Sequence, residues 1–180
     1  MEEGLTSFDE MKLTDDEKPD FDKIRAALSI PTPRRLLYVA QAMRHGMTNE
    51  EIFDACKIDP WFLERIRVII DTEEPVKEKG LPIDQSGWLK VKQLGFGDAR
   101  LAKLVNVEEQ TVTTARLKNN VHEVFKRVDT CAAEIPSETP YMYSTYETPL
   151  FGEAEDESEP TDRKKVVILG GGPNRIGQGI

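Results

Sequence analysis

The sequence predicts an all-α protein: a compact multi-helix domain, then an extended linker, then a strand and glycine loop that begin an α/β domain. Three observations predict it. Apolar residues recur at three- and four-residue spacing over much of residues 20–120, as in helices that bury one face. Capping and breaking residues separate these stretches at short intervals, as in packed helical units. After residue 164 a short apolar run precedes several glycines, which is typical of a buried parallel strand and its loop.

The first two helices are separated by proline. A short helix is expected over residues 21–28, and Ser29-Ile30-Pro31 ends it because a residue before proline disfavours helix. A second helix is expected to start with Thr32 as N-cap and Pro33 at the first helical position. Gly46 stands just past its expected end. The apolar stripe of this second helix consists of Leu36, Leu37, Ala40 and Met43.

The next two helices have strong start signals. Thr48-Asn49-Glu50-Glu51 matches a capping box, so a helix is expected from there to about Cys56. Asp59-Pro60 repeats the cap-plus-proline start for a longer helix. Pro75 is expected to end or kink that helix near residues 72–74, because proline lacks an N–H donor. Its apolar stripe consists of Phe62, Leu63, Ile66, Ile69 and Ile70.

Three more helices are expected at about residues 84–94, 98–105 and 108–119, with glycines between the first two. The last two resemble a helix-turn-helix, so an independent DNA-binding regulator is the alternative function. Glu108 and Glu109 would face the bases in that arrangement, and phosphates would repel them. Two packed core helices are the simpler interpretation.

Regular patterns cease after residue 120. Residues 121–163 are expected to form an extended segment and an acidic linker, in which 141–146 lies against another surface and 153–159 is solvated. Residues 1–19 form a polar lead-in before the helical domain of residues 20–120. Residues 164–180 are the truncated start of a further domain, whose strand has no evident partner strand in this chain.

Composition limits the function. The net charge of −9 disfavours binding to nucleic acid or to an anionic membrane. Two distant cysteines indicate neither a disulfide framework nor a metal site, and they suit a reducing compartment. No apolar run approaches the ~20 residues of a membrane span, and the N-terminus lacks the features of a signal peptide. A cytoplasmic protein without a bound metal is expected, and no paired carboxylates or placed nucleophile indicate a catalytic residue.

The terminal glycine loop meets neither standard nucleotide signature. Arg175 stands where a dinucleotide fingerprint needs its third glycine, and Gln178-Gly179 follow where a P-loop needs lysine and a hydroxyl. Glycines that expose backbone amides, together with an arginine, nevertheless favour an anion. A strand-to-helix turn without a ligand remains the alternative. The anion-loop candidates are Gly172, Asn174, Arg175, Gln178 and Gly179.

Five strings of residues make a family recognisable. They are Asp59-Pro60-Trp61-Phe62-Leu63, Gly95-Phe96-Gly97-Asp98-Ala99-Arg100-Leu101-Ala102-Lys103-Leu104, Phe125-Lys126-Arg127-Val128-Asp129-Thr130-Cys131-Ala132-Ala133-Glu134, Tyr141-Met142-Tyr143-Ser144-Thr145-Tyr146-Glu147 and Gly170-Gly171-Gly172-Pro173-Asn174-Arg175-Ile176-Gly177-Gln178-Gly179. Together they resemble, in order, the large subunit of glutamine-dependent carbamoyl phosphate synthetase. The resemblance spans nearly the whole chain.

The resemblance implies a role within a larger ligase. The family's large subunit has two ATP-using synthetase halves, with a helical oligomerisation domain between them, and makes carbamoyl phosphate for arginine and pyrimidine synthesis. This chain resembles the oligomerisation domain with the start of the second half, the pre-ATP-grasp region, so Met1 need not be a natural start. Implied partners are the other synthetase domains, the glutaminase small subunit and further copies of the chain. ATP and Mg or Mn would serve the intact enzyme, whose ATP-grasp folds are absent here.

The same resemblance implies a role for the glycine loop. In the family this region lies near an internal passage that carries carbamate between active sites. Arg175, Gln178 and Gly179 are the candidates for lining that passage. The chain alone is expected to be inactive.

Overall fold

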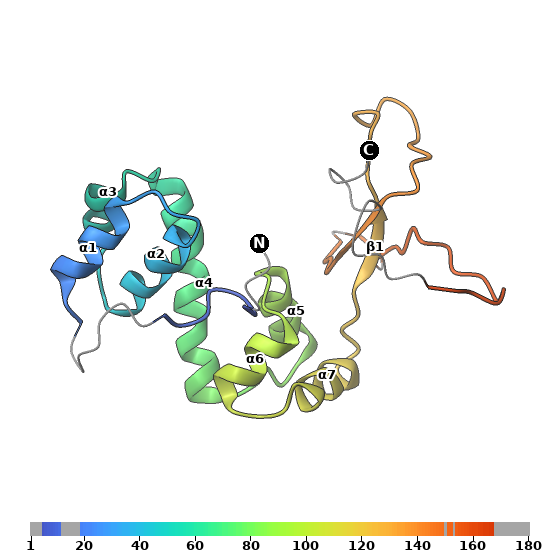
Figure 1. Ribbon diagram of the computed structural model, residues 1–180. Helices are drawn as coiled ribbons and strands as arrows, with labels where there is room; N and C mark the ends of the chain where they lie inside the picture. Colours follow the sequence, from blue (N-terminus) through green and yellow to red (C-terminus); the bar gives the residue numbers. More distant parts are fainter. Residues whose placement is uncertain (1–4, 12–18, 150, 153, 168–180) are drawn as a thin grey trace. The chain divides into compact units, whose positions relative to one another are not determined.

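The computed structural model describes residues 5–11, 19–149, 151–152 and 154–167. Seven helices and two short strands lie in these residues (Figure 1), so the predicted all-α domain is confirmed. The described residues divide into two compact units. The first takes in those of 1–124 and 144–154, and the second those of 125–143 and 155–180.

The first part of the first unit is a four-helix packing. Its members are α1 (Phe21–Ser29), α2 (Arg35–Arg44), α3 (Asn49–Cys56) and the beginning of α4 (Pro60–Lys79). Asp20 caps α1 by accepting hydrogen bonds from the backbone N–H groups of Asp22 and Lys23. The helix ends at Ser29, directly before Ile30-Pro31, as the sequence predicts.

Helix α2 starts later than predicted. Thr32 does not cap it, because residues 32–34 form a tight turn in which the Arg35 N–H donates to the Thr32 carbonyl (3.1 Å). The buried Thr32 hydroxyl has no partner among the described residues. Arg34 is therefore the N-cap, and Gly46 follows the helix in the left-handed region (φ +86°), as expected of a residue past a helix end.

The start signals of α3 and α4 are confirmed. Thr48 and Glu51 form the reciprocal capping box, and the Asp59 carboxylate accepts from the Trp61 N–H with Pro60 at the first helical position. Pro75 is expected from the sequence to end or kink the long helix. It does not end it, since α4 continues to Lys79. One lost backbone hydrogen bond does not end the helix, because Val76 beyond it is buried in a second core.

Helix α4 joins two hydrophobic cores. Its 20 residues are about 30 Å long. Leu63, Ile66 and Ile70 belong to the first core, with α1–α3, whereas Val76 belongs to the second. The second core also holds the buried side chains Trp88, Val91, Phe96, Leu101, Ala102, Val112 and Val121. The two cores are therefore consecutive along one helix (Figure 1).

The second core is built by three short helices. They are α5 (Gln85–Gln93), α6 (Asp98–Val105) and α7 (Glu109–Lys118), within a residue or two of the predicted bounds. Gly95 takes a left-handed conformation (φ +90°), which turns the chain between α5 and α6. Helix α7 packs against α6, as core helices do.

The second unit contains little regular structure. Strands β1 (Val124–Arg127) and β2 (Met142–Thr145) pair as a two-stranded sheet. The acidic stretch contacts β1 instead of being wholly solvated: the Glu157 carboxylate accepts from the Arg127 N–H (2.7 Å) and pairs with Lys126 (3.3 Å). The predicted glycine loop lies outside the described residues.

Candidate functional site

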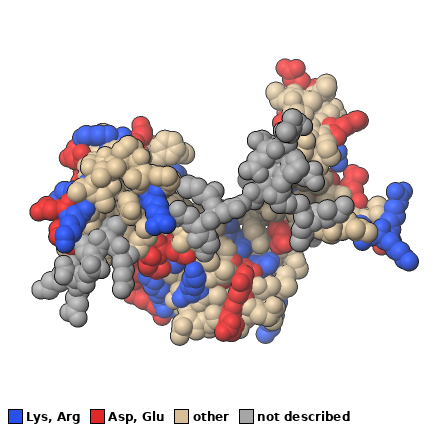
Figure 2. Space-filling model, in the orientation of Figure 1, with Lys and Arg blue, Asp and Glu red and all other residues tan. Residues whose placement is uncertain are grey.

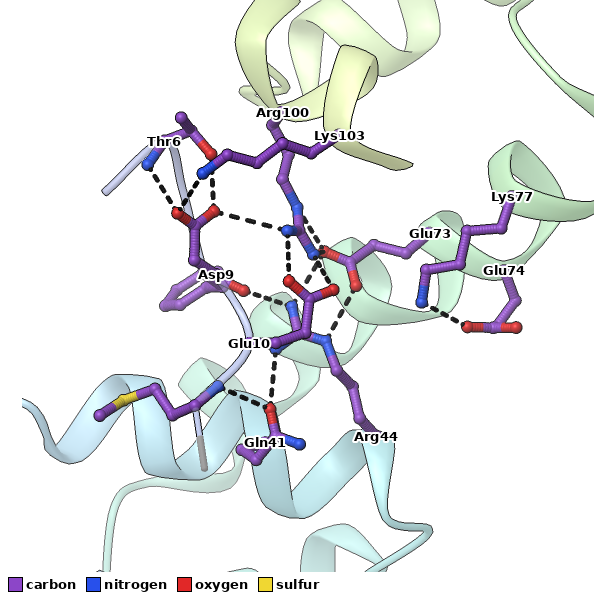
Figure 3. A network of polar contacts seen from close by, with 12 residues as sticks. Thr6, Asp9, Glu10, Gln41, Arg44, Glu73, Glu74, Lys77, Arg100 and Lys103 are labelled. Atoms are coloured by element: carbon purple, nitrogen blue, oxygen red, sulfur yellow. Dashed lines mark hydrogen bonds and ion pairs between the residues drawn. The ribbon is translucent and has the colours of Figure 1, made fainter. Parts of the chain in front are cut away.

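A buried ionic network lies between the two cores (Figure 3). At its centre is Arg100 of α6, whose side chain is 0% exposed. Its guanidinium donates to Glu73 of α4 (2.5 and 3.1 Å) and to Glu10 (2.8 and 3.0 Å). A carboxyl oxygen of Asp9 lies 3.4 Å away. The pair with Glu10 is bidentate, whereas both bonds to Glu73 go to one carboxylate oxygen. These charge-assisted hydrogen bonds compensate for removing the charge from water.

Glu73 links the two halves of the first unit. It lies on α4 between Ile70 of the first core and Val76 of the second, and its side chain is 2% exposed. Besides Arg100, it accepts two hydrogen bonds of 2.9 Å from Arg44 of α2. A single carboxylate therefore holds one arginine from each helical group.

A segment from far away in the sequence completes the network. We call residues 5–11 the strap. Asp9 pairs with Lys103 (2.9 Å), and the Met11 N–H donates to the Gln41 side chain (3.2 Å). Arg44 also donates to the Phe8 carbonyl, and the Phe8 side chain packs against the first core. The strap thus contacts α2 and α6 together.

Charge and pKa values agree with a stably ionised strap. Burial alone would raise the pKa of Asp9, but hydrogen bonds from Thr6 and Lys103 and the Lys103 charge lower it to about 2. Hydrogen bonds from Arg100 lower the pKa of Glu10 to about 2 despite partial burial. The network holds three carboxylates and three cations, so its formal charges cancel: Asp9, Glu10 and Glu73 face Arg44, Arg100 and Lys103.

Acid is expected to release the strap. Because the folded pKa values of Asp9 and Glu10 lie below their ordinary 3.8 and 4.5, the stabilisation is fully present above about pH 5. It should be lost as the pH falls towards about 2. Asp9 contributes at most about 2 kcal/mol, and Glu10 less because its side chain is 51% exposed and screened by solvent. Urea midpoints from circular dichroism between pH 6 and pH 2 measure the loss.

The matched variant for this prediction neutralises the strap without changing its shape. Asp9→Asn with Glu10→Gln should make the urea midpoint fall less steeply below pH 5 than in the wild type. Equal slopes in the two proteins would show that the strap carboxylates do not cause the acid sensitivity.

A second buried network surrounds Asp98 at the start of α6. Its carboxylate accepts from Lys92 (2.8 Å), Arg116 (3.1 Å) and the Thr113 hydroxyl (2.9 Å). Burial would raise the pKa of Asp98, but these donors outweigh it and lower the pKa. Arg116 also donates to the Val121 carbonyl (2.8 Å), which fixes the chain leaving α7.

The segment that returns from the second unit rests on this network. We call residues 144–148 the C-terminal anchor. Lys92 and Arg116 lie 5.1 and 5.9 Å from the centre of the Tyr146 ring, which packs against the second core. Gln93 donates to the Tyr146 carbonyl (3.2 Å) and to the Thr148 hydroxyl (2.8 Å). Burial raises the pKa of the Tyr146 phenol to about 12.

Chemically, the two networks can hold chain segments in place through ion pairs and hydrogen bonds. Within the described ranges, no group of three or more His, Cys, Asp or Glu side chains suits a metal ion. The described helices include none that could span a membrane. On the face drawn in Figure 2, basic and acidic side chains intermingle over the helical unit. Arg100, Lys103 and Arg116 of the helix-turn-helix-like pair are engaged in these internal ion pairs, and nothing here supports DNA binding.

Sequence reasoning missed both networks. The predicted site residues Gly172, Asn174, Arg175, Gln178 and Gly179 all lie outside the described residues. A usable signal was nonetheless present for Glu73, which continues the apolar stripe of α4 at the helical spacing after Ile66 and Ile70. A charge on a buried stripe requires a buried partner. No local pattern identifies that partner as Arg100.

Comparisons with known proteins agree on one family. The family model described as "Carbamoyl-phosphate synthetase large chain, oligomerisation domain" matches residues 1–120. The "Carbamoyl phosphate synthase large chain" of Brucella melitensis biotype 1 is 56% identical over 181 residues. Those of Rhizobium meliloti (strain 1021) and Neisseria meningitidis serogroup B are 54% and 48% identical. Each match covers 100% of this chain but only 16% of the relative's length.

Proposed function

The chain belongs to the carbamoyl-phosphate synthetase large-chain family, and on that premise we propose that it is a structural module of the ligase. In this role it holds the parts of the large chain on either side of it in register and self-associates. Its own residues bind and position segments of the same chain and perform no chemical step.

One observation carries this proposal: the helical unit binds the chain segment that precedes it and the segment that follows it. The strap precedes the helices and is held by Arg44, Arg100 and Lys103. The C-terminal anchor follows them and is held by Gln93 and the Lys92–Arg116 pair. Each set of contacts joins residues far apart in sequence. This is the arrangement that a spacer between two working domains needs.

The remaining features of the family are part of the proposal. The intact enzyme would convert bicarbonate, glutamine-derived ammonia and two ATP into carbamoyl phosphate for arginine and pyrimidine synthesis in the cytoplasm, with a glutaminase small subunit as partner. In this proposal, ATP and Mg or Mn bind in other parts of the large chain. No step involving them is assigned to this chain.

We also retain the proposed division of the chain. Residues 1–19 would end the first synthetase half, 20–120 would form the oligomerisation domain, 121–163 would form the linker and 164–180 would begin the second half. The loop with Gly172, Asn174, Arg175, Gln178 and Gly179 would border the carbamate passage.

Two measurements on the purified 180-residue chain test the proposed function. Bicarbonate-dependent ATP hydrolysis should not exceed the buffer rate, because in this proposal the chemical steps belong to other parts of the large chain. Light scattering after size exclusion should give a mass above the 20.4 kDa of one chain, rising with concentration.

The full-length large chain of one of the relatives serves as the positive control for hydrolysis. Measurable turnover by the 180-residue chain would contradict the assignment of a purely structural role. A mass of 20.4 kDa that persists into the millimolar range would contradict self-association.

A further inference from the structure

The two networks that hold the strap and the C-terminal anchor share one short helix. Helix α6 has eight residues. Arg100 holds Glu10 and Glu73 from this helix, and Asp98, two positions earlier, holds Lys92 and Arg116. The networks that hold the segments before and after the helical unit therefore both include residues of α6.

We propose that α6 couples the strap to the C-terminal anchor, so that release of either segment loosens the other. This inference rests on the proposed function, because it concerns how the module links its two neighbours. Helix α6 is the element through which displacement of one segment weakens the binding of the other.

The buried face of α6, formed by Arg100, Leu101 and Ala102, makes the coupling physically reasonable. Leu101 and Ala102 are buried in the second core, so the helix cannot shift without moving that core. Close-packed interiors transmit such shifts because they contain few voids. The ion pairs made by Arg100 and by Asp98 are short and charge-assisted. Their distances are 2.5 to 3.1 Å, from Arg100 to Glu73 and Glu10 and from Asp98 to Lys92 and Arg116. A small rotation of α6 therefore weakens both sets together.

The path from Asp98 to the anchor is direct. Lys92 and Arg116 each contact the Asp98 carboxylate on one side and the Tyr146 ring on the other. The phenol oxygen of Tyr146 also lies 3.3 Å from Glu123, which Arg116 contacts at 3.4 Å. If α6 moves, the side chains of Lys92 and Arg116 lose the carboxylate that positions them, and the surface that contacts the Tyr146 ring changes.

A double-mutant cycle on the 180-residue chain tests the coupling. One arm neutralises the strap (Asp9→Asn with Glu10→Gln), the second removes the anchor ring (Tyr146→Ala), and the third combines them. We expect the equilibrium constant for unfolding of the combined variant to differ by about fivefold from the product of the separate effects. Agreement with that product to within about twofold would overturn the proposal.

Asp54→Asn replaces the strap arm in a matched control cycle. Asp54 is an exposed carboxylate on α3, paired with Lys57 at 3.2 Å. Helix α3 packs in the first core, whereas α6 packs in the second. Its effect should multiply with that of Tyr146→Ala to within about twofold.

Two local readouts keep the test valid if a variant is too unstable for the cycle. With ¹³C-labelled tyrosine, the chain gives four ring signals, and the Tyr146 signal is the one that Tyr146→Phe removes. Neutralising the strap should shift this signal and leave those of Tyr141 and Tyr143 unchanged. Conversely, Tyr146→Ala should speed hydrogen exchange of the Met11 amide, which donates to Gln41. An unchanged Tyr146 signal with an unchanged Met11 rate would refute coupling.

These outcomes are independent of the tests of the proposed function. A chain that self-associates and lacks ATPase activity, yet shows multiplicative effects in the cycle, would retain its structural role without coupling through α6. A coupled chain that stays monomeric would lose only the self-association proposal.

Discussion

Replacing Arg100 with methionine is expected to lower the free energy of unfolding of the 180-residue chain by about 3 kcal/mol. Arg100 is fully buried, and its loss removes the donors that compensate Glu73 and Glu10. Removing one partner of a buried ion pair typically costs about 3–5 kcal/mol. The low end applies because Glu73 keeps two hydrogen bonds from Arg44 and because Glu10 is half exposed. Urea unfolding followed by far-ultraviolet circular dichroism measures the change.

Two further variants isolate the cause. Arg65→Met removes an exposed arginine whose described contact is with the Trp61 ring at 5.8 Å, and it should change stability by about 0.5 kcal/mol or less. The loss from Arg100→Met combined with Glu73→Gln should be smaller than the sum of the two separate losses, because both substitutions break the same Arg100–Glu73 pair. If Arg100→Met changed the free energy of unfolding as little as Arg65→Met, the buried network would contribute little to stability.

The sequence was sufficient where the determining interactions are local. Thr48 with Glu51, Asp59 with Pro60, and Gly46 predict where helices begin and end, because each acts on backbone groups within one turn. The α2 start was predicted wrongly for a tertiary reason. Arg35 donates to the carbonyls of Leu28 and Cys56, and these long-range bonds accompany a turn in place of a Thr32 cap.

The network could not be predicted because its partners are distant. Asp9 and Glu10 lie 90 or more positions from the residues that bind them on α6. Nothing in the local composition distinguishes these two from the other acidic residues of the lead-in. The passage of α4 through Pro75 is a similar case: local chemistry favours an end there. Burial of Val76 beyond it shows that core packing continues the helix.

Replacing Trp88 with alanine is expected to destabilise the chain by about 3–5 kcal/mol. Trp88 is 0% exposed and is the largest fully buried side chain of the second core. That core is small, so removal of the indole leaves a cavity that α5, α6 and α7 cannot close without losing the ion pairs of Asp98. Circular dichroism is the suitable probe, because the substitution removes one of the two tryptophans that fluorescence would report.

The other tryptophan provides the control. Trp61 is 63% exposed on α4, so Trp61→Ala should cost about 0.5 kcal/mol or less. Trp88→Phe separates the effect of lost side-chain volume from the effect of the buried N–H group. The Trp88 Nε1–H has no acceptor among the described residues. An unsatisfied buried donor costs about 1–3 kcal/mol. Phenylalanine removes that donor while leaving most of the ring volume, so its net effect should be below about 1 kcal/mol. A loss from Trp88→Phe as large as that from Trp88→Ala would show that the indole N–H is paired in solution and stabilises the core.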